Sequence, residues 1–197
     1  LSTWNVWFDR FRREERNTAL LAELECYRPH VMLFQEVTPP FVRALQAAEW
    51  LKNGYWLSGV EHSEIGVVMV ARVRCHELRF HPLTSQMGRR LLTGRFAGGA
   101  TVAGAHFESN RGAGETRAVQ FSEALDILQS ETAAVLAGDF NSTAEDPESE
   151  KLTGRTRDAW STLHPEKPGY TIDSQANEML RKQAPGQTAQ PRIDRLL

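Results

Sequence analysis

Four apolar stretches along the chain end on polar residues of the kind that handle phosphate or metal. Those residues are Asn5, Glu36, His106 and the pair Asp139 and Asn141. Short apolar and β-branched runs predict buried strands. In layered α/β folds, the polar residues at strand ends gather along one edge of a sheet. The pattern therefore predicts a single active site assembled from four distant segments.

Hydrophobic periodicity predicts strands mixed with a few helices. Strands are expected at residues 1–7, 31–36, 65–71, 90–96, 101–106, 133–137 and 192–197, and helices at 13–27, 38–48 and 115–128. The high apolar density of 65–71 indicates a strand covered on both faces. Residues 142–191 are polar, acidic and expected to be mostly loop. This order predicts two sheets in the core with helices outside them.

Local signals refine three of these elements. Thr38 is the expected cap of the helix that begins at Pro39 and Pro40. The sequence Ala97-Gly98-Gly99 predicts the turn of a β-hairpin. In the helix at 115–128, the apolar side is expected to include Val119, Phe121, Leu125 and Leu128, broadened by Ala118 and Ala124.

Composition is that of one globular domain. The chain has 197 residues, of which 41% are hydrophobic and 24% charged. It contains no run of about twenty apolar residues, so neither a membrane span nor a membrane partner is expected. Cys26 and Cys75 are too few for a disulfide framework and are expected to be buried or half-buried thiols. That usage indicates an intracellular protein, cytoplasmic or nuclear, and we expect a monomer.

Arginine is concentrated in the middle of the chain. Residues 72–117 hold eight arginines, no lysine and three glutamates, although the net charge of the whole chain is −2. The planar guanidinium suits bidentate binding of phosphate. A basic stretch is more often a solvated face, but this one is interleaved with the strand that ends at His106, which favours phosphate binding.

Carboxylates and amides at the strand ends are the candidates for catalysis. Glu36 is the candidate ligand of Mg²⁺, which prefers hard oxygen donors; alternatively, it closes a strand at the surface. Asp139 and Asn141 lie two apart and would share one side of an extended segment. Asp139 would position or deprotonate a water, and the Asn141 amide would donate to developing negative charge. The alternative is a turn, since Gly-Asp-x-Asn is also good turn chemistry.

Two further strand ends offer hydrogen-bond donors. His106 is followed by Glu108, Ser109, Asn110 and Arg111, which supply several donors for one phosphate, although a strand-end histidine is often structural. Asn5 would bind phosphate or cap a turn, and the flanking Trp4 and Trp7 are expected in the core. The chain has neither the Gly-x-Ser-x-Gly elbow of serine hydrolases nor a Walker-type loop.

Seven segments carry a resemblance to a known family. They are Thr3-Trp4-Asn5, Leu33-Phe34-Gln35-Glu36-Val37-Thr38-Pro39-Pro40, Met87-Gly88-Arg89-Arg90-Leu91-Leu92, His106-Phe107-Glu108-Ser109-Asn110-Arg111, Ala137-Gly138-Asp139-Phe140-Asn141, Tyr170-Thr171-Ile172-Asp173 and Arg192-Ile193-Asp194-Arg195. Together they resemble the endonuclease/exonuclease/phosphatase superfamily, with its deoxyribonuclease-I-like fold. His-x-Glu-Ser-x-Arg and Tyr-Thr-x-Asp indicate the branch of tyrosyl-DNA phosphodiesterase 2. The resemblance implies an α/β (α+β) fold, a four-layer two-sheet β-sandwich flanked by helices.

The resemblance also implies a role for each site residue. Glu36 would hold Mg²⁺, which Mn²⁺ can replace; Asp139 and Asn141 would orient the attacking water; Asn5 and His106 would bind phosphate oxygens; Ser109, Arg111 and Arg90 would bind the substrate; and Asp194 would orient a further histidine. The implied reaction is single-displacement hydrolysis of a phosphodiester, with the metal and the donors stabilising the pentavalent phosphorus.

The chain departs from the family pattern at four places. The superfamily continues past the Asp194 strand with Ser-Asp-His, whereas this sequence ends at Leu197. We therefore expect one domain, 1–197, that lacks its C-terminal strand. Thr143 stands where the branch has an arginine, and Ile172 replaces a tryptophan. After Asn5 the chain reads Val-Trp-Phe-Asp instead of Ile-Asp-Gly.

Three functions remain open at this point. The leading hypothesis is a Mg²⁺-dependent phosphodiesterase acting in DNA repair on a DNA end, such as one blocked by a 5′-phosphotyrosyl adduct. The first alternative is the same chemistry on RNA, a nucleotide or another small phosphodiester, motivated by Thr143 and Ile172. The second is a non-catalytic module that binds phosphate, supported only by the absent terminal histidine. The presence of Glu36, Asp139 and Asn141 favours an enzyme.

Overall fold

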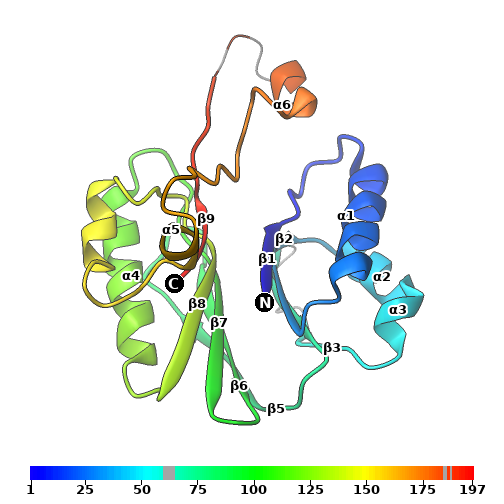
Figure 1. Ribbon diagram of the computed structural model, residues 1–197, viewed down its shortest axis with the longest axis horizontal. Helices are drawn as coiled ribbons and strands as arrows, with labels where there is room; N and C mark the ends of the chain where they lie inside the picture. The colour runs from blue at the N-terminus through cyan, green and yellow to red at the C-terminus, as the bar shows by residue number, and fades with distance from the viewer. Residues whose placement is uncertain (60–64, 184–185, 187) are drawn as a thin grey trace.

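Two β-sheets pack face to face, and helices cover their outer faces (Figure 1). The computed structural model describes residues 1–59, 65–183, 186 and 188–197. In the first sheet the strand order is β1 (Ser2–Asn5), β2 (Val31–Val37), β4 (Gly66–Ala71) and β3 (Trp56–Leu57). In the second it is β5 (Cys75–Pro82), β6 (Arg90–Phe96), β7 (Ala100–His106), β8 (Ala133–Asp139) and β9 (Asp194–Leu196). The two-sheet sandwich with outer helices, four layers in all, is thus confirmed.

Helices lie on both sides of the sandwich. The first sheet is covered by α1 (Arg13–Tyr27), α2 (Pro39–Ala47) and α3 (Glu49–Lys52), and the second by α4 (Gly114–Leu128) (Figure 1). Three short helices follow β8: η1 (Pro147–Lys151), α5 (Ala159–Leu163) and α6 (Glu178–Gln183). Within the described ranges, no helix combines the length and the apolar character that crossing a membrane requires.

Three apolar layers hold the sandwich together. Between the sheets, Leu33 and Met69 of the first pack with Leu92 and Ala137 of the second. Between the first sheet and its helices lie Met32, Phe34, Val68, Val70, Leu20, Leu24, Phe41 and Leu45. Between the second sheet and α4 lie Leu91, Ala103, Leu136, Phe121, Ala124, Leu125 and Leu128. Because alternate residues of β2 and β4 belong to different layers, both faces of these strands are covered, as predicted for 65–71.

Most predicted elements are present with small shifts in their bounds. The helix at 13–27 and the hairpin of β6 and β7 are confirmed. Thr38 does precede α2, but its side chain makes no capping hydrogen bond; its carbonyl accepts from Phe41 N and Val42 N instead. The stretch 142–191, expected as loop, contains three short helices, and its residues 184, 185 and 187 lie outside the described part.

The predicted burial is wrong at three positions. Val119 is 46% exposed, since it lies two residues, or about 200°, from Phe121 on the helix. Trp4 is 50% exposed because β1 is the edge strand of its sheet. Cys26 is exposed, whereas Cys75 is half-buried as expected. The strand β5 was not predicted, because its alternation of polar and apolar residues is irregular and it is only partly buried.

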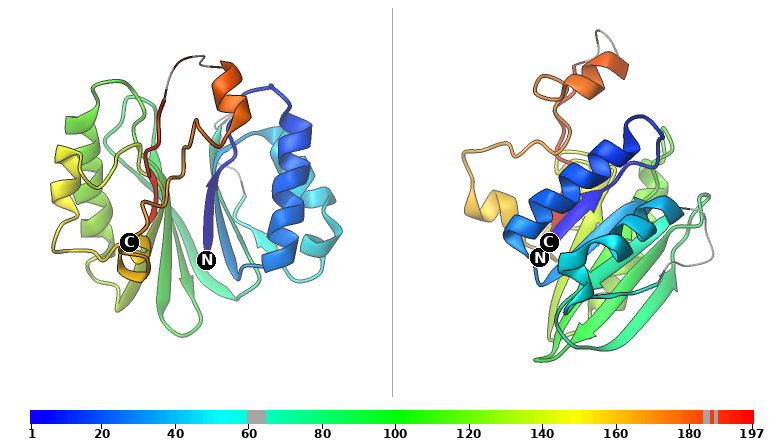
Figure 2. Two further views of the ribbon diagram at one scale, coloured as in Figure 1. Left: turned by 45° about the horizontal axis from the view of Figure 1, so that its top comes forward. Right: turned by 90° about the vertical axis from the view of Figure 1, so that its right-hand side faces the viewer.

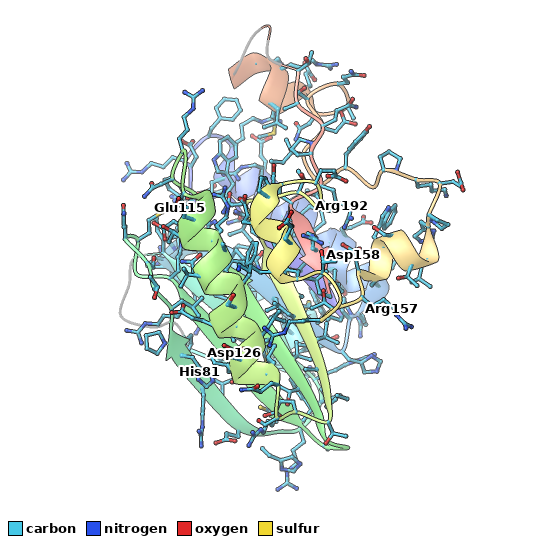
Figure 3. All side chains as sticks on the ribbon, turned by 90° about the vertical axis from the view of Figure 1, so that its left-hand side faces the viewer. His81, Glu115, Asp126, Arg157, Asp158 and Arg192 are labelled. Carbon is cyan, nitrogen blue, oxygen red and sulfur yellow. The ribbon has the colours of Figure 1, made fainter. Side chains whose placement is uncertain are left out.

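Strand β9 is held at the edge of its sheet by a small ionic network (Figure 3). Asp158 Oδ2 accepts hydrogen bonds from Arg192 Nη1 at 2.8 Å and from Arg195 Nε at 3.1 Å. Burial raises the pKa of Asp158, but the bonds from Arg192, Ser161 N and Arg195 outweigh that effect, so the pKa lies below its ordinary value. The Arg195 guanidinium also lies 5.3 Å from the centre of the Phe140 ring. The network therefore connects β9 with the end of β8.

Replacing Asp158 with Asn should destabilise the fold in a pH-dependent way. Because the folded-state pKa is depressed, the carboxylate contributes stability above its unfolded value of 3.8 and loses that contribution as the pH falls further. We expect Asp158→Asn to lower the free energy of unfolding by about 2 kcal/mol at pH 7, and by less at pH 3, in urea titrations.

The control for this experiment is Asp126→Asn. Asp126 pairs with Arg155 on the exposed side of α4 (Figure 3), where an ion pair contributes little. Equal losses for Asp158→Asn at both pH values would show that the charge of Asp158 has no part in holding β9.

Candidate active site

The polar residues that follow the apolar stretches meet at one edge of the sandwich. Strand β1 ends at Asn5, β7 at His106 and β8 at Asp139, while Glu36 is the penultimate residue of β2. In the parallel pairs, Asn5 lies opposite Gln35, and His106 lies opposite Asp139. Strand β1 faces β8 and β9 across the sheet interface (Figure 2). The structure thus brings together Asn5, Glu36, His106 and Asp139.

Asn5 is the centre of this cluster. Its Nδ2 donates to Glu36 Oε1 and to Asp139 Oδ2, both at 2.9 Å. Its Oδ1 accepts from Trp7 N at 2.9 Å, which fixes the orientation of the amide. Glu36 Oε2 in turn accepts from Phe8 N at 2.9 Å. One amide therefore connects two carboxylates that come from different sheets.

His106 is buried and held as a neutral imidazole. Arg89 Nη1 donates to His106 Nδ1 at 2.9 Å. Burial, with a smaller contribution from the Arg89 charge, lowers the pKa of His106 to about 3. Since Nδ1 accepts, the proton is on Nε2, which lies 3.9 Å from Glu36 Oε1 and 3.8 Å from Asp139 Oδ2. At neutral pH, His106 can thus donate a hydrogen bond but is not an ion-pair partner.

Negative charge is concentrated beside His106. Burial raises the pKa of Asp139, against the opposing hydrogen bonds from Asn5 and Asn141 N. Burial, followed by the charge of Asp139, raises the pKa of Asp194 to about 7. Asp139 and Asp194 are paired across β8 and β9, and Asp194 Oδ1 is buried without a hydrogen-bond partner among the described residues. The site is therefore suited to a cation or to a group that donates hydrogen bonds.

Backbone strain is concentrated in the same region. Trp7, Glu36 and Asn141 have φ values of 57°, 57° and 48°, in the left-handed region. Each such residue costs about 1–3 kcal/mol and persists where its surroundings determine it. Glu36 occupies a bulge in the pairing of β2 with β4, between Phe34 and Val37, which turns its side chain out of the regular alternation.

Asn141 is not placed as the sequence predicted. Its left-handed backbone ends the extended segment, so Asn141 and Asp139 do not share a side of one strand. Asn141 Nδ2 donates to Phe107 O at 3.0 Å, and its backbone N–H donates to Asp139 Oδ1 at 2.9 Å. The turn that was the alternative interpretation is present, and Asn141 supports Asp139 through its backbone.

Among the predicted substrate-binding residues, Ser109 lies next to the cluster. Ser109 Oγ accepts from Arg89 Nη2 at 3.0 Å, whereas Arg90 and Arg111 are exposed on the surface. The guanidinium that reaches His106 belongs to Arg89, which the sequence pattern did not single out. Arg89 and Arg90 are neighbours in the segment Met87–Leu92. Since neighbouring residues at the start of a strand point to opposite faces, the sequence indicates that only one of the two can face the site, but not which one.

A second residue that the sequence pattern did not reveal is Arg16, on the first turn of α1. Its guanidinium donates to the carbonyl oxygens of Val6, Trp7, Asp9 and Phe11 at 2.6–3.1 Å and lies 4.4 Å from the Trp7 ring centre. It thereby holds the loop that supplies Trp7 N to Asn5 and Phe8 N to Glu36. No sequence signal distinguished Arg16 from other helix-surface arginines.

The arginine-rich stretch 72–117 does not form one phosphate-binding face. Arg95 pairs with Glu77 on the outer side of the second sheet, and Arg117 pairs with Glu148 beside α4. Of these, Arg89 is the one that enters the cluster.

The residues present fit a hard divalent cation. Glu36 and Asp139 place two carboxylates near the Arg89 guanidinium, Asp194 lies close to both of these carboxylates, and the Glu36 side chain remains 15% exposed. In the described part of the chain, no three His, Cys, Asp or Glu side chains converge as a metal cage. Mg²⁺ does not need one, since it keeps several waters and binds through one or two carboxylates.

Known proteins share this fold and sequence pattern. Tyrosyl-DNA phosphodiesterase 2 of Gallus gallus is 29% identical over 196 residues, which is 92% of this chain and 52% of that protein. D. rerio TDP2 complexed with single-strand DNA product superposes with a TM-score of 0.84 at 26% identity, over 98% of this chain and 80% of that one. A β-hairpin deletion mutant of the β toxin from Staphylococcus aureus shares the fold, with a TM-score of 0.78 at 14% identity, over 99% of this chain and 85% of that one.

The chain spans about half the length of the curated relatives that it matches. The sequence profile described as the Endonuclease/Exonuclease/phosphatase family matches residues 2–197. The profile match covers nearly the whole chain, and the two-sheet sandwich is the deoxyribonuclease-I-like fold. The chain therefore belongs to the endonuclease/exonuclease/phosphatase family.

Proposed function

We propose that this chain is a Mg²⁺-dependent phosphodiesterase that hydrolyses a phosphodiester at a DNA end, and that a 5′-phosphotyrosyl adduct is its substrate. The observation that carries the proposal is the cluster in which Asn5 joins Glu36 to Asp139 beside a neutral His106. A relative named tyrosyl-DNA phosphodiesterase 2 and a structural neighbour with single-strand DNA product support the choice of substrate.

The proposed chemistry assigns one task to each side chain. Asp139, with one oxygen fixed by Asn141 N, accepts a proton from the attacking water, whose oxygen then forms a bond to phosphorus while the bond to the leaving oxygen breaks. His106 Nε2–H donates to the phosphate oxygens as negative charge develops, and Asn5 Nδ2 joins it by exchanging one of its two carboxylate bonds for a phosphate oxygen. Glu36 would hold Mg²⁺ together with waters; when bound, the metal would supply Lewis-acid stabilisation of the same charge.

Asp194 has a supporting task in this proposal. Its Oδ1 is buried and has no hydrogen-bond partner among the described residues, while its backbone N–H donates to Thr171 Oγ1 at 3.1 Å. A buried carboxylate oxygen without a partner is costly. Its availability supports the prediction that Asp194 orients a further histidine.

The substrate is tested with a single-stranded oligonucleotide that carries a 5′-phosphotyrosine. The assay should be run with and without Mg²⁺. We expect tyrosine to be released only when the metal is present. Cleavage of a generic diester such as bis(p-nitrophenyl) phosphate without release of tyrosine would keep the chemistry but exclude the proposed substrate.

The metal is tested by Glu36→Gln. Removing the carboxylate charge while keeping the side-chain shape should weaken Mg²⁺ binding at least about tenfold, as measured by isothermal titration calorimetry without substrate. Glu115→Gln, at an exposed position on α4, is the matched control and should bind Mg²⁺ like the parent protein. Unchanged affinity in Glu36→Gln would remove Glu36 from the metal site.

A second substrate class, RNA, a nucleotide or another small phosphodiester, is favoured by one observation. Thr143 stands where the branch has an arginine. It lies in a turn, where its backbone N–H donates to Asp146 Oδ2 at 2.7 Å, and it supplies no guanidinium for the substrate phosphate. If the protein contacts several phosphates of a DNA strand, its affinity should fall steeply with salt. The logarithm of the binding constant against the logarithm of the salt concentration would then have a slope of about −0.7 per contacted phosphate. A nearly flat salt dependence would support the small substrate.

A further inference from the structure

Glu108 belongs to the His-x-Glu-Ser-x-Arg motif, yet the proposed chemistry gives it no task. It is 1% exposed, and a buried carboxylate is costly unless its oxygens accept hydrogen bonds. Its Oε2 accepts from Ser85 Oγ at 2.6 Å and from Gln120 Nε2 at 3.4 Å, and its Oε1 accepts from Asn110 Nδ2 at 3.2 Å. Both oxygens are thus engaged with neighbouring side chains rather than directed at a substrate.

Ser85 connects Glu108 to the backbone of the loop 83–89, which joins β5 to β6. While Ser85 Oγ donates to Glu108, it accepts from Met87 N and Arg89 N, both at 3.0 Å. Leu83 N donates to Arg89 O at 3.1 Å, so the two ends of the loop are tied together. The backbone of Arg89 is therefore held through both its N–H and its carbonyl.

Gln120 of α4 also hydrogen-bonds to the loop 83–89. Its Oε1 accepts from Glu108 N at 2.9 Å, and its Nε2 donates to Thr84 O at 2.8 Å. Gln120 is fully buried. Glu108, Ser85 and Gln120 form one connected network that reaches the loop carrying Arg89 through Ser85 and Thr84, while Asn110 and Arg117 hold Glu108 from its other side.

Arg89 is the member of this loop that touches the proposed catalytic cluster. Its Nη1 donates to His106 Nδ1 at 2.9 Å and its Nη2 donates to Ser109 Oγ at 3.0 Å. The first bond decides which imidazole nitrogen carries the proton. A small displacement of Arg89 would therefore release the His106 ring from the orientation in which Nε2–H faces Asp139.

We propose that Glu108 and Ser85 are positioning residues, which hold the loop 83–89 so that Arg89 fixes the orientation and tautomer of His106. The expected effect on turnover rests on the proposed function, whereas the expected effect on the tautomer and orientation of His106 does not. These two effects can therefore be measured separately.

The test is a double-mutant cycle. Ser85→Ala should lower kcat on bis(p-nitrophenyl) phosphate about tenfold, with a smaller change in KM, because a slightly misplaced donor weakens the transition state. Ser85→Thr, which keeps the hydroxyl, should restore most of the activity. In an Arg89→Ala background, Ser85→Ala should cause no further loss, since coupled residues are not additive.

The matched control is Thr101→Val. Thr101 Oγ1 donates to Glu131 Oε2 at 2.6 Å, the same length as the bond from Ser85 to Glu108, but it lies near the start of β7, at the end of the strand opposite His106. We expect its kcat to stay within about twofold of the parent value. Equal losses from Ser85→Ala with and without Arg89 would overturn the proposal, because Ser85 would then act by another route.

A second readout does not need turnover. In protein labelled with ¹⁵N-histidine, the ring-nitrogen shifts of His106 report its tautomer, and Ser85→Ala should change them while Thr101→Val leaves them in place. If the parent protein hydrolyses no diester, the proposed function fails and these shifts alone decide the inference. Unchanged His106 shifts in Ser85→Ala would refute it.

Discussion

Asp139→Asn should lower kcat by about 10³-fold or more, which is the range expected when a general base is removed. Asp139 Oδ2 accepts from Asn5 Nδ2, and its Oδ1 accepts from Asn141 N. An amide can accept on only one side, so its NH₂ would face one of these two donors. The substitution also removes the charge that would draw a proton from water. The measurement is steady-state hydrolysis of bis(p-nitrophenyl) phosphate with saturating Mg²⁺.

The stability of Asp139→Asn separates loss of chemistry from loss of fold. Because burial raises the pKa of Asp139, its charged form costs stability at pH 7, and the cost grows as the pH rises above the unfolded value. We therefore expect the relief of this buried charge to offset the hydrogen bond that the amide loses, so that the metal-free variant remains folded. Asp126→Asn, on the exposed side of α4, should change neither activity nor melting temperature. Activity within about tenfold of the parent value would exclude Asp139 as the base.

Gly138→Ala should destabilise the protein by at least about 3 kcal/mol, from strained backbone and overpacking together. Gly138 has φ of 145° and lies opposite Ala105 in the parallel pair of β7 and β8. A Cβ at this position would lie 1.9 Å from Ala105 O. Neither strand can yield, because both are paired on their other sides as well. Urea unfolding at pH 7 measures the loss.

Gly98→Ala is the control for the steric contribution. Gly98 also has positive φ, 91°, but an added Cβ would meet no atom within 4 Å in the hairpin turn. It should cost only the backbone strain, about 1–2 kcal/mol. Equal losses for the two variants would show that the contact with Ala105 is not what requires glycine at position 138.

The strain at Trp7, Glu36 and Asn141 lies where the proposed chemistry is. Each of these residues leaves the regular strand geometry at or just beyond a strand end. The loop after Asn5 is held by Arg16, and the Asn141 turn is held by its own bonds to Phe107 and Asp139. Stability elsewhere in the sandwich thus maintains a rigid cluster of donors and carboxylates, which is what electrostatic catalysis needs.

Local sequence determined the elements of this fold and where its chemistry gathers. Apolar runs long enough to bury, with polar residues at their ends, are sufficient to predict that Asn5, Glu36, His106 and Asp139 lie at one edge of the sandwich. The family motifs agree with this placement. These features are readable because strand periodicity and strand ends depend on residues only a few positions apart.

Tertiary structure decided which atoms the site residues offer. Whether Asn141 presents its amide or donates it to Phe107, and whether Arg89 or Arg90 reaches His106, depends on partners 17 to 34 residues away. The same holds for Arg16 and Ser85, because each hydrogen-bonds to the backbone of a loop beside the site. The bulge at Glu36 exists only because β2 pairs with β4. The physical reason is that hydrogen-bond partners across strands and loops are set by packing of the whole sandwich, which no local pattern encodes.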